Sequence, residues 1–161
     1  MLAAVDVRWW IFLHVAGVLV FVMAHGVSIA VALRLRKERD RVRIAELLQF
    51  SGASVRWMYI ALLWLVAAGV ITAFAISAWG QWWLWASIGS LVLVIAEMSA
   101  VAGPYYRRVK EAVEVRPSGV PRRSDEELDE ILRSGTALLN TLVGFAALVA
   151  ILWLMVFKPG V

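Results

Sequence analysis

Four long apolar stretches constrain the fold of this chain more than any other feature of its sequence. They are residues 9–33, 57–79, 82–106 and 135–157, and each exceeds the roughly 20 residues that a helix needs to cross a hydrocarbon core. Glu97 is the only formally charged residue inside them. Apolar residues make up 62% of the 161-residue chain, more than a soluble domain usually carries. We therefore predict an all-α polytopic membrane protein, a single domain over residues 1–161 with four transmembrane helices in an up-down bundle.

The Lys and Arg residues predict how this bundle lies in the membrane. Of the sixteen, seven lie in the segment 34–56, seven in 107–134, one before the first stretch and one after the last. Loops rich in Lys and Arg stay on the cytoplasmic side, so we predict cytoplasmic loops at 34–56 and 107–134 and both termini outside. The uncharged connection at residues 80–81 is so short that the second and third helices should form an antiparallel hairpin.

Tryptophan supports the same orientation, because its amphipathic ring favours the headgroup region of a membrane. Seven of the nine tryptophans map to the predicted outer ends of the helices: Trp9, Trp10, Trp79, Trp82, Trp83, Trp85 and Trp153. The first stretch ends in arginines without a small-residue cleavage pattern, so we expect it to remain as the first helix rather than to act as a signal peptide. Small size and strong charge bias favour a bacterial inner membrane.

Composition also restricts the partners of the chain. The net charge of +4 comes from basic residues that flank membrane spans, which indicates contact with anionic lipid and excludes nucleic-acid binding. The chain has no cysteine, and so no disulfide or thiolate metal site. Small residues four apart, such as Gly26 with Ala30 and Gly69 with Ala73, mark close helix packing. A homodimer and a place in a larger membrane complex are both open.

The two basic segments contain helical patterns of their own. In the first, Ile44, Leu47 and Leu48 recur at helical spacing, so we expect either an extension of the first helix or an interfacial amphipathic turn, with the turn into the second helix at Ser51-Gly52. In the second, the third helix should reach about Val115 before a Pro- and Gly-rich break. Ser124 and Glu127 then form a capping-box pattern that predicts a new helix.

Two histidines in the first stretch are the main candidates for a cofactor site. His14 and His25 are eleven residues apart, close to three helical turns, so they share one face at about 16 Å separation. Gly17 on that face would leave space for a flat prosthetic group, and imidazole is a usual axial ligand of haem iron. Both histidines are therefore candidate metal ligands for haem b. The separation forbids ligation of one iron by both, so a second ligand would be Met98, a water or a histidine of another subunit.

Polar residues at matching depth allow other readings of the same histidines. His25 and Glu97 fall at one depth in the cytoplasmic half, where Ser28 and Asn140 also lie, and they could pair as a proton relay. His14 falls in the outer half, where Thr72, Ser87 and Ser90 are its expected neighbours. A buried histidine in a membrane helix can also serve structure alone, by hydrogen-bonding across a helix interface.

Two short motifs in the first stretch resemble a known family. They are Phe12-Leu13-His14-Val15-Ala16-Gly17 and Ala24-His25-Gly26-Val27-Ser28, the second continuing into the arginine-rich residues 34–43. With four apolar stretches and basic loops on one side, the chain resembles the uncharacterised bacterial integral membrane proteins grouped as DUF2269, related to the CopD-like group. The wider group includes a haem-binding protoporphyrinogen oxidase with a similarly placed histidine, so the resemblance implies that His14 is a haem ligand. The second stretch lacks the Lys or Arg of the oxidase pattern, so that activity is not expected.

We therefore expect a small b-type haem protein or a subunit of a membrane redox complex that transfers electrons, with no enzyme activity of its own. Two alternatives stay open. One is a cofactor-free accessory or scaffold subunit of a membrane complex. The other is proton-coupled transport that uses His25 and Glu97.

Overall fold

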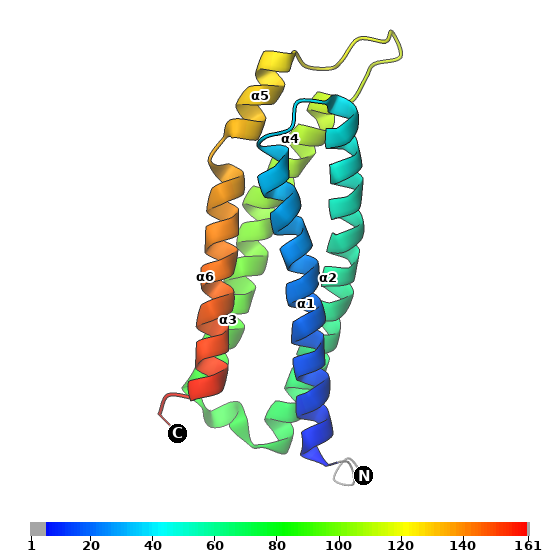
Figure 1. Cartoon of the computed structure of the whole chain (residues 1–161). Coiled ribbons are helices and arrows are strands. Elements are labelled where there is room, and N and C mark those ends of the chain that lie inside the picture. Colours follow the sequence, from blue (N-terminus) through cyan, green and yellow to red (C-terminus); the bar gives the residue numbers. More distant parts are fainter. Residues whose placement is uncertain (1–5, 161) are drawn as a thin grey trace.

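The computed structural model describes residues 6–160 and confirms an all-α four-helix architecture (Figure 1). Four helical segments are long and apolar enough to cross a membrane: Val7–Leu35, Arg41–Ala75, Trp82–Val113 and Asp125–Phe157. Large apolar side chains stay exposed along their outer faces, among them Leu19, Leu63 and Leu93. Exposed apolar surface on this scale would be unfavourable in water and is what a hydrocarbon environment requires. The protein is a membrane protein.

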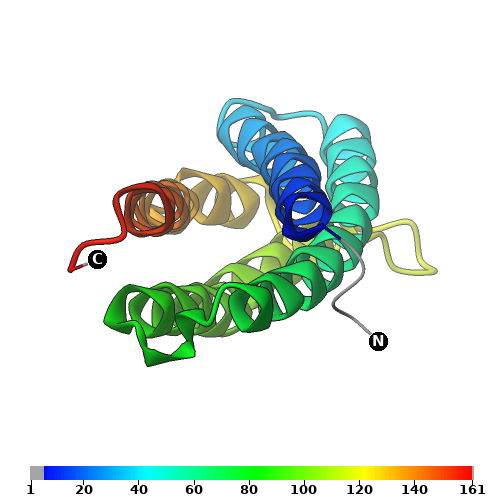
Figure 2. The same ribbon diagram turned by 90° about the horizontal axis from the view of Figure 1, so that it is seen from below.

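The elements follow one another along the chain with short connections. They are α1 (Val7–Leu35), α2 (Arg41–Ala75), the 3₁₀ helix η2 (Ala78–Gly80), α3 (Trp82–Glu97), the π-helix η3 (Met98–Ala102), α4 (Gly103–Val113), α5 (Asp125–Arg133) and α6 (Thr136–Phe157). Figures 1 and 2 show α1, α2, the continuous run from α3 to α4, called here the third column, and α6. Between α4 and α5, an isolated antiparallel bridge joins Val115 to Pro121 within the described chain.

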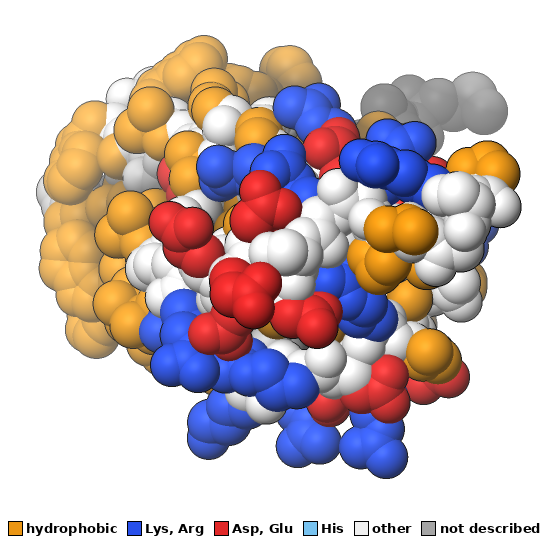
Figure 3. Space-filling model, turned by 90° about the horizontal axis from the view of Figure 1, so that it is seen from above, with side chains coloured by type: hydrophobic (Ala, Val, Ile, Leu, Met, Phe, Trp, Pro, Cys, Tyr) orange, Lys and Arg blue, Asp and Glu red, His pale blue; other side chains and the backbone are white. Residues whose placement is uncertain are grey.

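The bundle has two chemically different ends. The end formed by residues 36–40, α4 and α5 carries Arg, Lys, Asp and Glu side chains and is called here the arginine-rich end (Figure 3). The start of α1 and the end of α6 lie at the opposite, tryptophan-rich end (Figure 1). This is the arrangement predicted from the charge distribution: helices alternate in direction, and the basic segments share one side.

The first basic segment folds differently from the prediction. Residues 41–56, expected in a loop, are the beginning of α2, which runs unbroken through Ser51 and Gly52. The chain turns instead at residues 36–40, where the Asp40 side chain accepts a hydrogen bond from the Val42 N–H and caps the helix. This cap satisfies one of the free N–H groups of the first turn. The extension or turn expected around Ile44 is therefore wrong, and this segment belongs to the second helix.

The second basic segment is close to its prediction. The third column ends at Val113, and Ser124 and Glu127 form the expected capping box at the start of α5. A π-helical turn, which the sequence did not predict, interrupts the column at Met98–Ala102, where the Gly103 N–H bonds to the Met98 carbonyl. Pro104 follows at once, and its missing N–H and its ring disrupt regular α-helical bonding of the preceding turn.

The π turn lies where the third column changes partners. Below it α3 packs against α6, and above it α4 packs against α2 and α5. The closest helix pair is α1 with α2, while α2 and α3 have few close contacts. The chain does reverse direction between α2 and α3, as predicted, but these two helices do not pack as a hairpin. The membrane part consists instead of two helix pairs, α1 with α2 and α3 with α6.

The best-packed core lies at the arginine-rich end. Leu35, Ile44, Val109 and Leu132 are fully buried there, between α1, α2, α4 and α5. Arg41 closes this core: its guanidinium donates to Asp125 and to the backbone carbonyls of Ala112 and Arg123. We call this region the cap. Through the cap, the ends of α1 and α2 pack against α4 and α5, which continue the other helix pair.

Candidate functional sites around the two histidines

His14 contacts the neighbouring helix through its Nδ1 atom. Nδ1 lies 2.7 Å from the Leu65 carbonyl oxygen of α2. A carbonyl only accepts, so Nδ1 carries the proton, and Nε2 of the neutral ring is left with its lone pair. His14 is half-buried, and Nε2 has no hydrogen-bond partner among the described residues. The same Nδ1–H to carbonyl bond commonly orients metal-binding histidines.

Glycines let α1 and α2 approach closely around this bond. A Cβ on Gly69 would lie 2.9 Å from His14 Nδ1, and one on Gly17 would lie 2.8 Å from the Trp64 ring. Gly17 therefore admits α2 and leaves no slot for a prosthetic group, which corrects the prediction. Trp64 of α2 makes a hydrogen bond in the opposite direction, because its indole N–H donates to the Leu13 carbonyl of α1 over 3.0 Å.

The hydroxyls predicted to lie near His14 do not bond to it. The hydroxyls of Thr72, Ser87 and Ser90 each donate to a carbonyl four residues earlier in their own helix. Such hydroxyls satisfy themselves locally and need no partner across the bundle. Leu65 was not foreseen because its contribution is a backbone carbonyl, which carries no mark in the sequence. Gly69 did stand out as a small residue, but not as a partner of His14.

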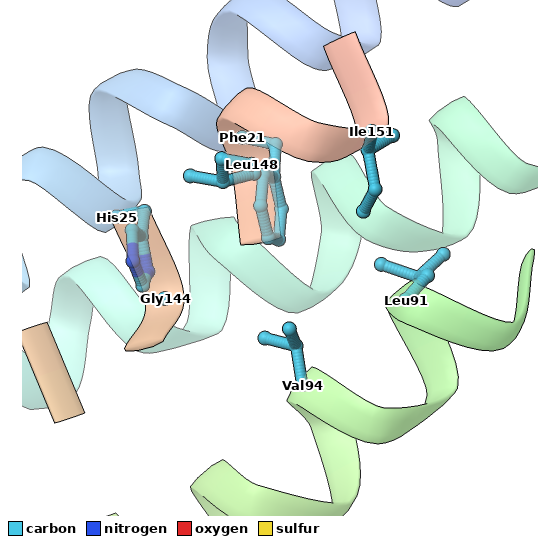
Figure 4. A pocket seen from close by; sticks show the side chains of 7 residues that line it. All are labelled: Phe21, His25, Leu91, Val94, Gly144, Leu148 and Ile151. Atoms are coloured by element: carbon cyan, nitrogen blue, oxygen red, sulfur yellow. The ribbon is translucent and has the colours of Figure 1, made fainter. Parts of the chain in front are cut away.

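His25 is buried in a different environment. Only 6% of its surface is exposed, and neither ring nitrogen has a hydrogen-bond partner in the described chain. Its ring lies nearly parallel to Phe21, with centroids 6.0 Å apart. Its Nε2 faces Gly144 of α6, where a Cβ would approach to 3.1 Å (Figure 4). His25 thus lies at the contact between α1 and α6.

A small cavity adjoins His25. Leu91 and Val94 of α3 and Leu148 and Ile151 of α6 line it with Phe21 and Gly144 (Figure 4). Its volume is about 10 Å³, close to the space of one water and far below the several hundred Å³ of a cofactor pocket. His25 therefore does not fit a haem in this packing.

Met98 is not arranged as a second haem ligand. Its side chain packs against the apolar cluster of Phe21, Met58 and Leu65 at the core of the α1–α2 pair. The four residues predicted for cofactor binding, His14, His25, Gly17 and Met98, are thus not brought together into one site.

Glu97 and His25 do not pair directly. The Glu97 Oε2 atom is buried without a hydrogen-bond partner, as are both His25 nitrogens, and no ion pair joins the two residues among those described. Ser28 Oγ and Asn140 Oδ1 are also buried without a partner. These four residues thus share one property, an unsatisfied polar atom inside the bundle, although no direct bond connects them.

A comparison with protein-family models, with the curated proteins and with the solved structures finds no match. The resemblance to DUF2269 therefore stays a prediction, and the functional argument depends on the residues themselves.

Proposed function

We propose that this protein is a b-type haem-binding membrane protein that serves in electron transfer, with His14 as the axial ligand supplied by this chain. The observation that carries the proposal is the 2.7 Å bond from His14 Nδ1–H to the Leu65 carbonyl. It fixes the tautomer and the ring orientation, and directs the coordinating lone pair to Nε2. A bound haem would supply a one-electron Fe(III)/Fe(II) couple.

The residues of the α1–α2 pair would each have a defined part in holding the ligand. The Leu65 carbonyl makes the imidazole more basic by accepting its Nδ1–H. Gly69 leaves room for the His14 ring against the backbone of α2. The bond from Trp64 to the carbonyl of Leu13, the residue before His14, holds α1 against α2. His14 is thereby held rigidly, and rigidity of this kind keeps a ligand in place when the iron changes oxidation state.

The second ligand has to come from outside this arrangement, since neither His25 nor Met98 is placed for it. Water and a histidine of another subunit are the remaining choices. Because His14 is only half-buried, a second copy of the chain or another subunit could complete the site. We accordingly propose a place in a membrane redox complex or a homodimer.

The test of haem binding is an absorption spectrum. The protein should be expressed with ample haem, purified in mild detergent and measured before and after dithionite. We expect a Soret band that shifts on reduction. A colourless protein that co-purifies with other subunits would contradict the proposal and support a cofactor-free accessory or scaffold subunit.

Substitution of each histidine assigns the ligand. His14→Ala should remove the Soret band, and added imidazole should restore it by filling the space that the side chain leaves. His25→Ala is the matched control, since it removes a buried histidine of the same helix, and the band should remain. Loss of the band in His25→Ala alone would overturn the assignment to His14.

We also propose that the protein lies in a bacterial inner membrane with its arginine-rich end in the cytoplasm. The even split of the basic residues between two segments at one end supports this orientation. The chain has no cysteine, so single cysteines report cleanly on accessibility. In intact cells, a membrane-impermeant maleimide should label Gln81→Cys and leave Ser118→Cys unlabelled; the reverse pattern would invert the orientation.

A further inference from the structure

The strongest unexplained feature of the bundle is a group of buried polar atoms without partners. The five atoms belong to four residues, named here the polar cluster: His25 Nδ1 and Nε2, Ser28 Oγ, Glu97 Oε2 and Asn140 Oδ1. An unsatisfied buried polar atom destabilises the folded protein, because it has lost its hydrogen bonds to water. In native proteins, buried polar atoms without a protein partner commonly bind an internal water or ion.

Helix geometry places Ser28, Glu97 and Asn140 at one level of the bundle, about one turn from His25. His25, Val94 and Gly144 line the same small cavity from α1, α3 and α6. Ser28 and Glu97 each lie three residues further along α1 and α3, toward the arginine-rich end. Asn140 lies four residues before Gly144 on α6, which runs in the opposite direction, so it reaches the same level. Three helices therefore each contribute one polar residue about one turn, or roughly 5 Å, above the cavity.

The π-helical turn lies at this level as well. It begins at Met98, directly after Glu97, and packs against α6, the helix that carries Asn140. Pro104 has no N–H to donate back into this turn, so a backbone carbonyl there is short of a donor. π turns within longer helices are frequent at functional sites. The turn thus lies beside α6 directly after Glu97 and leaves a backbone carbonyl short of a donor.

The chemistry of the four residues favours a proton over a metal ion. Imidazole and a carboxyl group both bind and release protons, whereas a hard cation such as sodium prefers oxygen ligands alone. Around His25 the packed surfaces of α3 and α6 are apolar, and Glu97 is the single acidic residue of the apolar spans. The nearest other charged groups along α1 are the arginines beyond Val31, from Arg34 onward.

We propose that His25, Ser28, Glu97 and Asn140 form an internal hydrated site in which water carries a proton between the Glu97 carboxyl group and the His25 ring. The cavity beside His25 has room for one water, which would have His25 as its polar partner there. Ser28 and Asn140, about one turn further along, are the polar groups to which further waters would bind. The proton leaves Glu97 for water while water gives a proton to His25, so that neutral acid and base become a carboxylate and an imidazolium. Both states have zero net charge, which limits the cost of ionisation in the membrane.

This site is separate from the proposed haem ligand. His14 and His25 are about 16 Å apart along α1, and His14 is satisfied by α2 while His25 faces α3 and α6. The proposal of a hydrated site therefore does not depend on whether the protein binds haem.

The sign of a stability change tests whether water is present. Asn140→Leu replaces the amide by an apolar group of similar shape. If internal water binds Asn140, the unfolded-to-folded ratio at fixed denaturant should rise roughly three- to tenfold, as for other lost hydrogen bonds between membrane helices. If the amide oxygen is dry and unpartnered, its removal should stabilise the protein, and that result would overturn the proposal. Ser28→Ala should change stability in the same direction as Asn140→Leu.

Infrared difference spectroscopy tests the proton directly. The spectrum of the wild type minus that of Glu97→Gln isolates the Glu97 carboxyl band, and transfer to D₂O should shift it as the proton exchanges through water. Gly144→Ala places a methyl group against His25 Nε2 and should slow this exchange at least tenfold. Gly89→Ala is the matched control, because no atom lies within 4 Å of its added Cβ. A band that does not shift in the wild type, or equal rates in the two glycine variants, would contradict the proposal.

Discussion

At the arginine-rich end, Arg41 donates to a carboxylate and to two backbone carbonyls, and Asp129 lies within 2.8 Å of Arg39 and 2.6 Å of Arg133. About two turns deeper in the bundle, the nitrogens of His25 and the amide oxygen of Asn140 have no partner at all. Both regions bury polar groups under well-packed side chains. Asp125 and other charged groups at the rim of the cap are exposed to water, whereas His25 is buried inside the bundle. An unpaired polar group therefore costs more in the bundle than at this rim.

The difference teaches which part of the molecule holds the fold and which part is available for function. The cap contains the most completely buried residues and joins α1, α2, α4 and α5. Helices α1 and α2 are also joined by polar contacts. Three hydrogen bonds run between them, from the side chains of His14, Trp64 and Ser54 to backbone carbonyls. The contact between α1 and the α3–α6 pair has no such bond among the residues described. On the α1 side of that contact, His25 and Ser28 have buried polar atoms without a partner.

Removing the central contact of the cap should have the largest effect. Arg41 is mostly buried, with 18% of its side chain exposed, and Arg41→Ala abolishes its bonds to Asp125, Ala112 and Arg123. We expect the free energy of unfolding to fall by about 2–3 kcal/mol, measured by denaturant titration in detergent. Arg43→Ala removes only an exposed pair with Asp40 at 3.7 Å and should cost less than about 1 kcal/mol. Equal losses would show that Arg41 does not hold the cap.

Filling the space beside His14 should have the next largest effect. Gly69→Ala introduces a Cβ 2.9 Å from the His14 ring, so the free energy of unfolding should fall by about 1–3 kcal/mol. Gly26→Ala is the matched control on α1, since no atom lies within 4 Å of its added Cβ. Thermal unfolding of both variants measures the difference. If Gly69→Ala were as stable as Gly26→Ala, the close α1–α2 contact would be wrong.

A single bond between membrane helices should contribute less. The Ser54 hydroxyl of α2 donates to the Ala24 carbonyl of α1 over 2.6 Å, and Ser54→Ala should cost about 0.6 kcal/mol. The Ser99 hydroxyl bonds only to the Ile95 carbonyl of its own helix, so Ser99→Ala should be close to neutral. Unfolding of the two variants in urea or detergent measures both changes in the free energy of unfolding. A larger loss of stability in Ser99→Ala than in Ser54→Ala would contradict the assigned role of Ser54.

The smallest effect is expected at the turn between α1 and α2. The pKa of Glu38 lies below its ordinary value because the carboxylate accepts from the Arg39 and Asp40 N–H groups, with Arg43 and Arg34 nearby. A lowered pKa means that Glu38 contributes stability above pH of about 4.3, its unfolded value, and loses it as the pH falls through the folded pKa.

Glu38→Gln separates this contribution from the rest. The variant should unfold slightly more easily than the wild type at pH 7, and the difference should vanish in acid below the folded pKa. Parallel denaturant titrations at both pH values measure it. A difference that grows as the pH falls would have the wrong sign and would contradict the assigned hydrogen bonds.

Sequence reasoning succeeded for features that a single segment specifies. The number of helices, the break after Val113 and the capping box of Ser124 and Glu127 are local properties, and the structure contains all of them. The prediction failed at Ser51-Gly52. Two small residues in an amphipathic segment can end a helix or lie within it, and here they lie within α2, which packs against α1. The π turn was missed although Pro104 was visible, because a proline has several ways to be accommodated in a helix.

The candidate site was predicted in its residues but not in its contacts. His14, His25 and Glu97 stood out as polar residues in apolar spans, which is a property of sequence. Their surroundings did not, because the Leu65 carbonyl, Gly69 and Gly144 carry no chemical mark that relates them to a histidine.

The sequence by itself determined that this chain has four membrane-crossing helices and that both of its ends lie opposite the basic segments. Hydropathy and charge are properties of each segment by itself. They decide whether the segment enters the membrane and which side its ends face, without contacts to other segments. Only the tertiary structure decided that α1 pairs with α2 and α3 with α6, that His14 is satisfied by a backbone carbonyl, and that His25 is not. These outcomes depend on contacts between distant segments at distances of about 3 Å, where the presence or absence of one Cβ selects the partner.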